Sequence, residues 1–153
     1  DLVSVTVENN NYQNYTTRIS DASIGTRIFV DYNRDECGSV PIYELTPAIN
    51  DTLTVFVSRS FTTRITMPAG NLTLIAISEG VDPYKLTAGE EVMLIIKQDS
   101  VGSRTTSWGS NIRWIANTAP TLSTTANRMD IFKFMYDGSK FIETMRTQNV
   151  YGA

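Results

Sequence analysis

The sequence has no histidine and only one cysteine among its 153 residues. Without histidine it cannot form the serine–histidine–aspartate or cysteine–histidine systems of nucleophilic catalysis, and it lacks the commonest zinc ligand. The single cysteine, Cys37, cannot make an intrachain disulfide, and we expect it to be packed or half exposed in a turn. No glycine-rich phosphate loop of either familiar spacing is present. We therefore predict neither an enzyme nor a bound cofactor or metal.

Basic residues and long apolar runs are also scarce. Lysine occurs only four times, and 13 basic against 16 acidic residues give a formal net charge of −3 without a basic cluster. This balance does not favour nucleic acid or an anionic membrane as the main partner. The longest apolar run is far short of the roughly 20 residues that a membrane span requires, and no signal peptide is recognisable. Because the chain starts with Asp1, we expect a processed product or a fragment of a longer protein.

Threonine and serine are abundant, with 33 residues between them. Threonine favours strands, and serine and asparagine favour turns, so the composition predicts an all-β protein. No window of convincing length has the helical period. Alternating or continuous apolar residues between turn signals predict about ten strands, and their spacing of roughly 8–12 residues predicts an antiparallel, jelly-roll-like β-sandwich. The predicted strands cover residues 2–8, 15–19, 27–32, 52–58, 61–67, 72–77, 92–96, 103–108, 130–136 and 141–146, and residues 33–47 are predicted to be a loop-rich connection with a brief extended piece at 42–45.

The stretch from Leu86 to Tyr136 organises this predicted sandwich. Its apolar run at 92–96 is short and bounded by turn residues, which is typical of a central strand buried on both faces. The Asp137-Gly138 dipeptide that follows is the strongest hairpin signal in the chain, because both residues tolerate positive φ angles. A change of composition near residues 47–52 divides the chain. We expect residues 1–50 to be part of the same sandwich or an attachment region, and residues 51–153 to be the sandwich domain.

A calcium-like motif begins at Asp31. Its D-x-N-x-D start imitates a calcium loop, but Glu36 stands where the sharp turn requires glycine, and Ile42 stands where the bidentate carboxylate belongs. A solvated acidic turn is the better interpretation. Glycoside hydrolysis would need two carboxylates that folding brings together, and the acidic residues at turns or strand ends are more typical of surface charges. Those residues are Glu90, Glu91, Asp99 and Asp130.

Two tryptophans suggest a possible contact surface. Trp108 and Trp114 flank a short polar segment, with Arg113 beside the second. One interpretation has their rings stack on sugars; the favoured one has both fill the core or a subunit contact. Tyr136 and Lys140 flank the predicted hairpin tip, and loop tips on a rigid sandwich are natural contact points. The candidate receptor or glycan contacts are therefore Trp114, Arg113, Tyr136 and Lys140.

Two sequence motifs carry a resemblance to a known family. Residues 98–105 read QDSVGSRT and residues 118–127 read TAPTLSTTAN, with Trp114 between them. This pair, at this spacing, resembles the β-sandwich domain of tailed-bacteriophage fibre, tail and other virion structural proteins. The resemblance extends roughly from Thr52 to Val150, and the first fifty residues match nothing recognisable. One departure is Ala116-Asn117, where similar proteins often have Gly-Gly.

The resemblance implies a β-sandwich at the end of, or mounted on, a homotrimeric fibre or a capsid or tail surface. Its implied partners are other copies of the chain, other virion proteins and a host-surface glycan or protein. The leading hypothesis is a non-enzymatic tail-fibre or tail-tip domain of a virion, involved in host attachment. The alternatives are a capsid decoration or head-fibre attachment protein and, in a different class, a free-standing carbohydrate-binding module.

Overall fold

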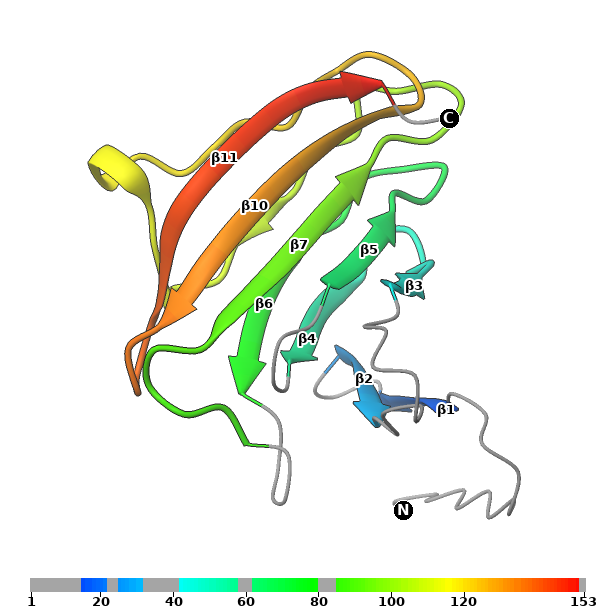
Figure 1. Cartoon of the computed structure of the whole chain (residues 1–153). Coiled ribbons are helices and arrows are strands. Elements are labelled where there is room, and N and C mark those ends of the chain that lie inside the picture. The colour runs from blue at the N-terminus through cyan, green and yellow to red at the C-terminus, as the bar shows by residue number, and fades with distance from the viewer. Residues whose placement is uncertain (1–14, 22–24, 32–41, 58–61, 80–84, 152–153) are drawn as a thin grey trace.

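The computed structural model describes residues 15–21, 25–31, 42–57, 62–79 and 85–151, and these ranges are all-β, as predicted (Figure 1). They contain eleven strands and one short 3₁₀ helix, η1 (Ile115–Asn117). The strands are β1 (Tyr15–Asp21), β2 (Gly25–Asp31), β3 (Ile42–Leu45), β4 (Thr52–Val57), β5 (Thr62–Thr66), β6 (Leu74–Glu79), β7 (Glu91–Lys97), β8 (Ser107–Trp108), β9 (Ile112–Arg113), β10 (Arg128–Tyr136) and β11 (Phe141–Tyr151).

Most of the predicted strands that fall in the described ranges are confirmed, and two predictions differ. The segment predicted as a strand over 103–108 is extended in a sheet only at β8, and β9 was not predicted. β9 has only two residues, which are too few to give a recognisable alternation of apolar and polar positions. The predicted strand at 2–8, Cys37 and the turn after Asp31 lie outside the described residues.

The strands form two sheets between which the chain repeatedly crosses. The five-stranded sheet has the order β1-β2-β4-β6-β8, and the six-stranded sheet has the order β3-β5-β7-β10-β11-β9. From β3 to β8, consecutive strands belong to alternate sheets. Figure 1 shows β5 beside β7 in one layer and β4 beside β6 in the other. The apolar run in β7 takes the central position predicted for it, between β5 and β10, but it is not fully buried on both faces, since Met93 on the outer face is only half-buried.

The prediction of an antiparallel, jelly-roll-like sandwich is wrong in its strand directions. Of the nine strand pairings in the described residues, only β1·β2, β7·β10 and β10·β11 are antiparallel. The physical reason is the alternation between sheets. Each of these strands pairs with the next-but-one strand of the chain, which belongs to the same sheet. The chain crosses to the other sheet and back between the two, so the paired strands run in the same direction. Local turn signals report antiparallel hairpins and do not report such crossings.

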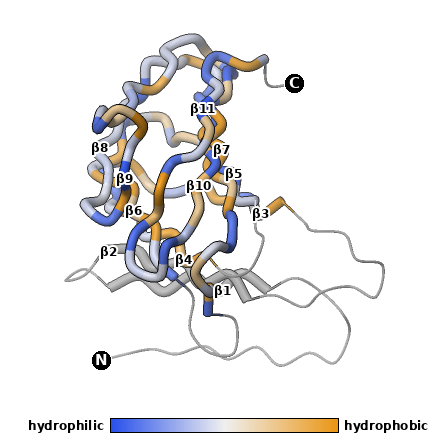
Figure 2. The backbone as a smooth tube through the Cα atoms, turned by 60° about the vertical axis from the view of Figure 1, so that its left-hand side comes forward, coloured by the Kyte–Doolittle hydropathy of each residue, from blue (hydrophilic) through white to orange (hydrophobic). Residues whose placement is uncertain are grey.

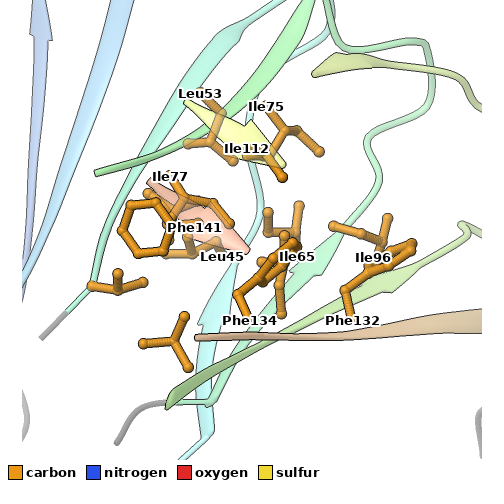
Figure 3. Packing of buried hydrophobic residues seen from close by; sticks show 14 of the residues in the cluster. Leu45, Leu53, Ile65, Ile75, Ile77, Ile96, Ile112, Phe132, Phe134 and Phe141 are labelled. Atoms are coloured by element: carbon orange, nitrogen blue, oxygen red, sulfur yellow. The ribbon is translucent and has the colours of Figure 1, made fainter. Parts of the chain in front are cut away.

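One hydrophobic core lies between the two sheets. Alternate residues of β4, β6, β7 and β10 are buried and point inward, so each strand contributes one apolar face. Figure 2 shows hydrophobic and hydrophilic residues mixed along the strands in this way. In Figure 3, Leu53 and Ile75 of the five-stranded sheet lie across from Phe132 and Phe134 of the six-stranded sheet. Complete burial of such aromatic side chains contributes a large share of the hydrophobic stabilisation.

The molecule has two ends that differ in their loops. β7 and β10 run antiparallel, so residues after Lys97 and before Met129 meet at one end, which we call the motif end. Residues around Glu90 and the β10–β11 turn meet at the opposite end, which we call the hairpin end. The predicted hairpin is confirmed, since Tyr136 pairs with Phe141 across the Asp-Gly turn.

Candidate functional site

The two sequence motifs fold against each other at the motif end. The Ser103 amide donates a hydrogen bond to the Thr124 carbonyl (2.8 Å), and the Asn127 amide donates to the Asp99 carbonyl (2.9 Å). Both bonds join the first motif to the end of the second. The pairing of the motifs in sequence therefore corresponds to a physical contact between their loops.

The first motif is closed by its own side chains. Gln98 is buried (2% exposed), and its amide both donates to the Arg104 carbonyl (2.9 Å) and accepts from the Arg104 amide (2.9 Å). Asp99 accepts from the amides of Val101 (3.1 Å) and Gly102 (2.7 Å) and from the Arg104 guanidinium at 3.0 and 2.8 Å. The Arg104 guanidinium, helped by these backbone amides, lowers the pKa of Asp99. The Gln98 side chain thus makes the two hydrogen bonds to the backbone of residue 104 that a neighbouring strand would otherwise make.

Gly102 is required at its position for two reasons. Its φ angle is +81°, a region that side chains with a Cβ rarely adopt. A Cβ there would also lie 2.4 Å from the Thr124 carbonyl oxygen and 2.7 Å from the Ala126 nitrogen. The glycine therefore lets the second motif approach the backbone of the first.

Asp130 fastens the second motif to the end of β11. Its carboxylate is buried (2% exposed) and accepts hydrogen bonds from the Ser123 amide (2.7 Å), the Ser123 hydroxyl (2.6 Å), the Asn149 amide (2.9 Å) and the Gln148 side-chain amide (3.3 Å). Such a fully bonded buried carboxylate holds three segments in one arrangement.

The acidic residues weighed as catalytic candidates have local partners instead. Glu90 accepts from the Thr87 amide (2.6 Å), and Glu91 pairs with Lys133 (2.6 Å). Asp99 and Asp130 are engaged as described above. Among the described side chains, no group of three or more Asp, Glu, His or Cys could hold a metal ion.

The two tryptophans pack on the aromatic part of the core. The Trp114 ring lies edge-on to Phe132 (6.0 Å between centroids) and Phe134 (5.7 Å), and 5.0 Å from Trp108. Trp108 also meets Phe132 edge-on at 5.5 Å. The Arg146 guanidinium lies 5.7 Å from the Trp114 ring centroid, a cation–π contact. Both indoles are partly buried and pack against the core cluster.

The other predicted contact residues gather at the hairpin end. Arg113 is exposed and pairs with Ile142 through the β9–β11 ladder, so β9 lies beside the hairpin that carries Lys140. Arg113 also helps to lower the pKa of Asp137, although the hydrogen bonds from the Lys140 and Ser139 amides are the larger cause. The structure thus brings Arg113 near Asp137 and the Lys140 turn, with Trp114 one residue further along.

Tyr136 does not occupy the surface position expected for a contact residue. It is buried (4% exposed), and its hydroxyl donates to Glu79 (3.0 Å). Burial, followed by this carboxylate, raises the pKa of Tyr136. Residue 136 occupies an inward position on β10, two positions from Phe134. Its ring therefore joins the core, while its hydroxyl reaches the Glu79 carboxylate.

The sequence reasoning missed the ion pair between Glu143 and Arg146. The Glu143 side chain is 0% exposed and accepts from Arg146 Nε (2.6 Å) and Nη2 (2.7 Å). The two residues reach the same side of β11 because the register shifts between Lys133 and Phe134 on the partner strand. A bulge of this kind leaves no mark in the sequence, since a regular strand places residues three apart on opposite faces.

The described residues thus form an all-β body in which the loops of the two motifs interlock. Residues 45–141, more than half of the chain, match the family model described as "Putative phage tail fibre C-terminal domain". The chain therefore belongs to this phage tail fibre family, which confirms the resemblance drawn from the motifs. It is a component of the virion tail and assembles there with other phage proteins.

The other comparisons add no relative. No curated protein and no solved structure shows a significant match. Within the described ranges, no helix has the length and hydropathy needed to cross a membrane.

Proposed function

We propose that this chain is a non-enzymatic attachment domain of a tail fibre, which contacts the host cell surface. The observation that carries the proposal is the tail fibre family match, which spans both motifs. In the structure, the side chains of the first motif close that motif, Asp130 holds the second, and backbone hydrogen bonds join the two, so the motifs build a rigid platform. A rigid platform with exposed loops suits display and recognition.

The arrangement of the acidic groups supports a role without catalysis. A glycan depolymerase needs two carboxylates facing each other across the scissile bond. Asp99 pairs with Arg104, and Asp130 is surrounded by four donor groups, so neither is available to a substrate. Arg113 and Lys140 at the hairpin end are proposed host contacts.

We further propose that the fibre is a homotrimer, as the family resemblance implies. Support comes from the outer face of the six-stranded sheet, which points away from the core. There Ile131 lies opposite Ile95, and Met93 lies beside the Glu91–Lys133 pair. Four of the five methionines lie on this face, where Met145 is 40% exposed and Ile95 is buried. Its apolar residues on β7, β10 and β11 are Met93, Ile95, Met129, Ile131, Met135, Ile142 and Met145.

Light scattering on the purified chain tests the assembly. We expect the mass of a trimer, and we expect Ile131→Asp to lower it while Thr144→Asp, an exposed change on β11, does not. A monomer at micromolar concentration with the unaltered chain would contradict the homotrimer.

Competition for host cells tests the attachment function. The purified chain is added to host cells before the phage that carries it, and the adsorption rate constant is measured. We expect the rate constant to fall as the chain occupies its receptors. Unchanged adsorption at saturating chain would overturn the proposal, and a label found on the head would favour capsid decoration instead.

A further inference from the structure

A short loop at the edge of the six-stranded sheet is built as a contact surface. Residues 115–119, which we call the Ile115 loop, are all exposed, and Ile115 itself is 49% exposed. In Figure 1, η1 stands out from the sheet beyond β11. The loop therefore presents itself away from the core rather than covering it.

The backbone of this loop is held in an unfavourable conformation. Ala116 and Asn117 have φ angles of 53° and 54°, in the left-handed region. Asparagine tolerates this region, but alanine there is uncommon, because its Cβ comes too close to the following carbonyl oxygen. Such strain persists only where the surroundings fix the backbone.

A buried ion pair supplies that fixation. Glu143 accepts a hydrogen bond from the Ile115 amide (2.9 Å), and Arg146 donates one to the Thr118 carbonyl (3.0 Å). The two side chains bond to each other and Arg146 covers the Trp114 ring, so both ends of the loop are fixed to β11. Burying an ion pair brings little net stability. Its effect here is to hold an exposed loop in one shape.

The chemistry of the loop selects a class of partner. No charged residue occurs from Trp114 to Asn127, so the loop has no attraction for a polyanion. Trp114, which directly precedes the loop, packs on the core and under Arg146, which leaves its faces poorly placed for stacking on a sugar. What remains exposed is the Ile115 side chain and small apolar and polar groups. An isoleucine on a rigid projection fits an apolar pocket in a protein.

We infer that the Ile115 loop is a further contact, in addition to Arg113 and Lys140, through which this domain recognises a protein on the host surface, with Ile115 seated in an apolar pocket of that protein. This inference rests on the proposed attachment function and adds the residue and the receptor class. Because the loop is preorganised, binding has no loop-ordering entropy to offset.

The test uses adsorption competition with matched variants of the full chain. Ile115→Asp places a charge in the proposed pocket, and Val101→Asp makes the same change at the motif end, where Val101 is 70% exposed. We expect Ile115→Asp to need about 10-fold or more chain for half-inhibition, the equivalent of 1.4 kcal/mol, while Val101→Asp competes like the unaltered chain. Circular dichroism confirms that both fold.

The outcomes distinguish failure of this inference from failure of the proposed attachment function. If the unaltered chain competes and Ile115→Asp competes equally, the inference is overturned and the attachment function stands. If the unaltered chain does not compete, the attachment function fails and the inference with it.

Treatment of the cells tests the receptor class. We expect protease treatment to abolish binding of the labelled chain and periodate treatment, which oxidises sugars, to leave it intact. Loss of binding after periodate alone would overturn a protein receptor. Ala116→Gly adds a test of preorganisation, for which we expect weaker competition without loss of folding stability; unchanged competition would contradict that step.

Discussion

The two ends of the molecule are stabilised in different ways. At the motif end, the buried carboxylate of Asp130 joins segments that are distant in the chain, Ser123 and Asn149. At the hairpin end, an exposed turn is closed locally, as Asp137 accepts from the Ser139 and Lys140 amides. The difference teaches that a buried aspartate, Asp130, serves tertiary structure, whereas an exposed one, Asp137, serves local turn formation. Substitutions should therefore disturb the motif end more.

The largest expected effect is that of Asp130→Ala. It leaves the amides of Ser123 and Asn149 without their acceptor, and an unsatisfied buried group costs about 1–3 kcal/mol. Denaturant unfolding measures the loss, and hydrogen exchange should accelerate at these two amides first. Asp137→Ala at the hairpin end is the control, with a smaller expected loss; equal losses would remove the distinction between the ends.

A pair of glycines sharpens the comparison. Gly102 at the motif end and Gly89 at the hairpin end both have positive φ angles, +81° and +95°. A Cβ at Gly89 meets nothing within 4 Å, whereas one at Gly102 would collide with the second motif. Gly89→Ala should cost roughly 1–2 kcal/mol from the backbone alone, and Gly102→Ala should cost more. A thermal melt of each variant gives the answer, and similar shifts would show that the motif loops can separate cheaply.

Acid should loosen the motif end through Asp99. Its pKa in the folded chain lies below the ordinary value of 3.8, mainly because of Arg104. The stability that it contributes is present above pH 4 and is lost as pH falls through the lowered pKa. Unfolding free energies measured from pH 7 to pH 2 should fall less steeply in Arg104→Met, and identical slopes would contradict this role.

The smallest expected effect is at the hairpin end. Tyr136→Phe removes the hydroxyl that donates to Glu79 but keeps the buried ring. We expect a loss of about 1 kcal/mol, the typical net value of one hydrogen bond. Competition for host cells should not change, because the residue is buried. A variant that folds normally but no longer competes would return Tyr136 to the contact surface.

Much of the fold could be predicted because its strands and its hairpin are encoded locally. Alternating residues in β4 and β5 and the Asp137-Gly138 turn each specify a structure within a few neighbours. The direction of pairing could not be predicted in this way. Whether the chain after β4 returns beside it or crosses to the other sheet depends on where both inner faces find a partner, which is a property of the whole core.

The candidate site was predictable in part. The motifs marked the interlocked loops, although their residues serve the structure rather than a ligand. Arg113 is exposed, whereas Tyr136 is buried because the phase of β10 brings position 136 inward with Phe134. The support of the Ile115 loop by Glu143 depends on a bulge, and no pattern in a single sequence reports one.

The crossing topology also allows change in the length of the chain. Ile42 pairs with Thr62, but Thr62 pairs with the more distant Met93, so the interval between neighbouring parallel strands is not constant. In the five-stranded sheet, the number of residues between paired positions likewise increases from the β4–β6 pair to the β6–β8 pair. The additional residues lie in the connections, while the ladders keep their register. Insertions at either end can therefore accumulate without shifting a strand, which lets such a fibre vary its outer segments in evolution while its interior stays the same.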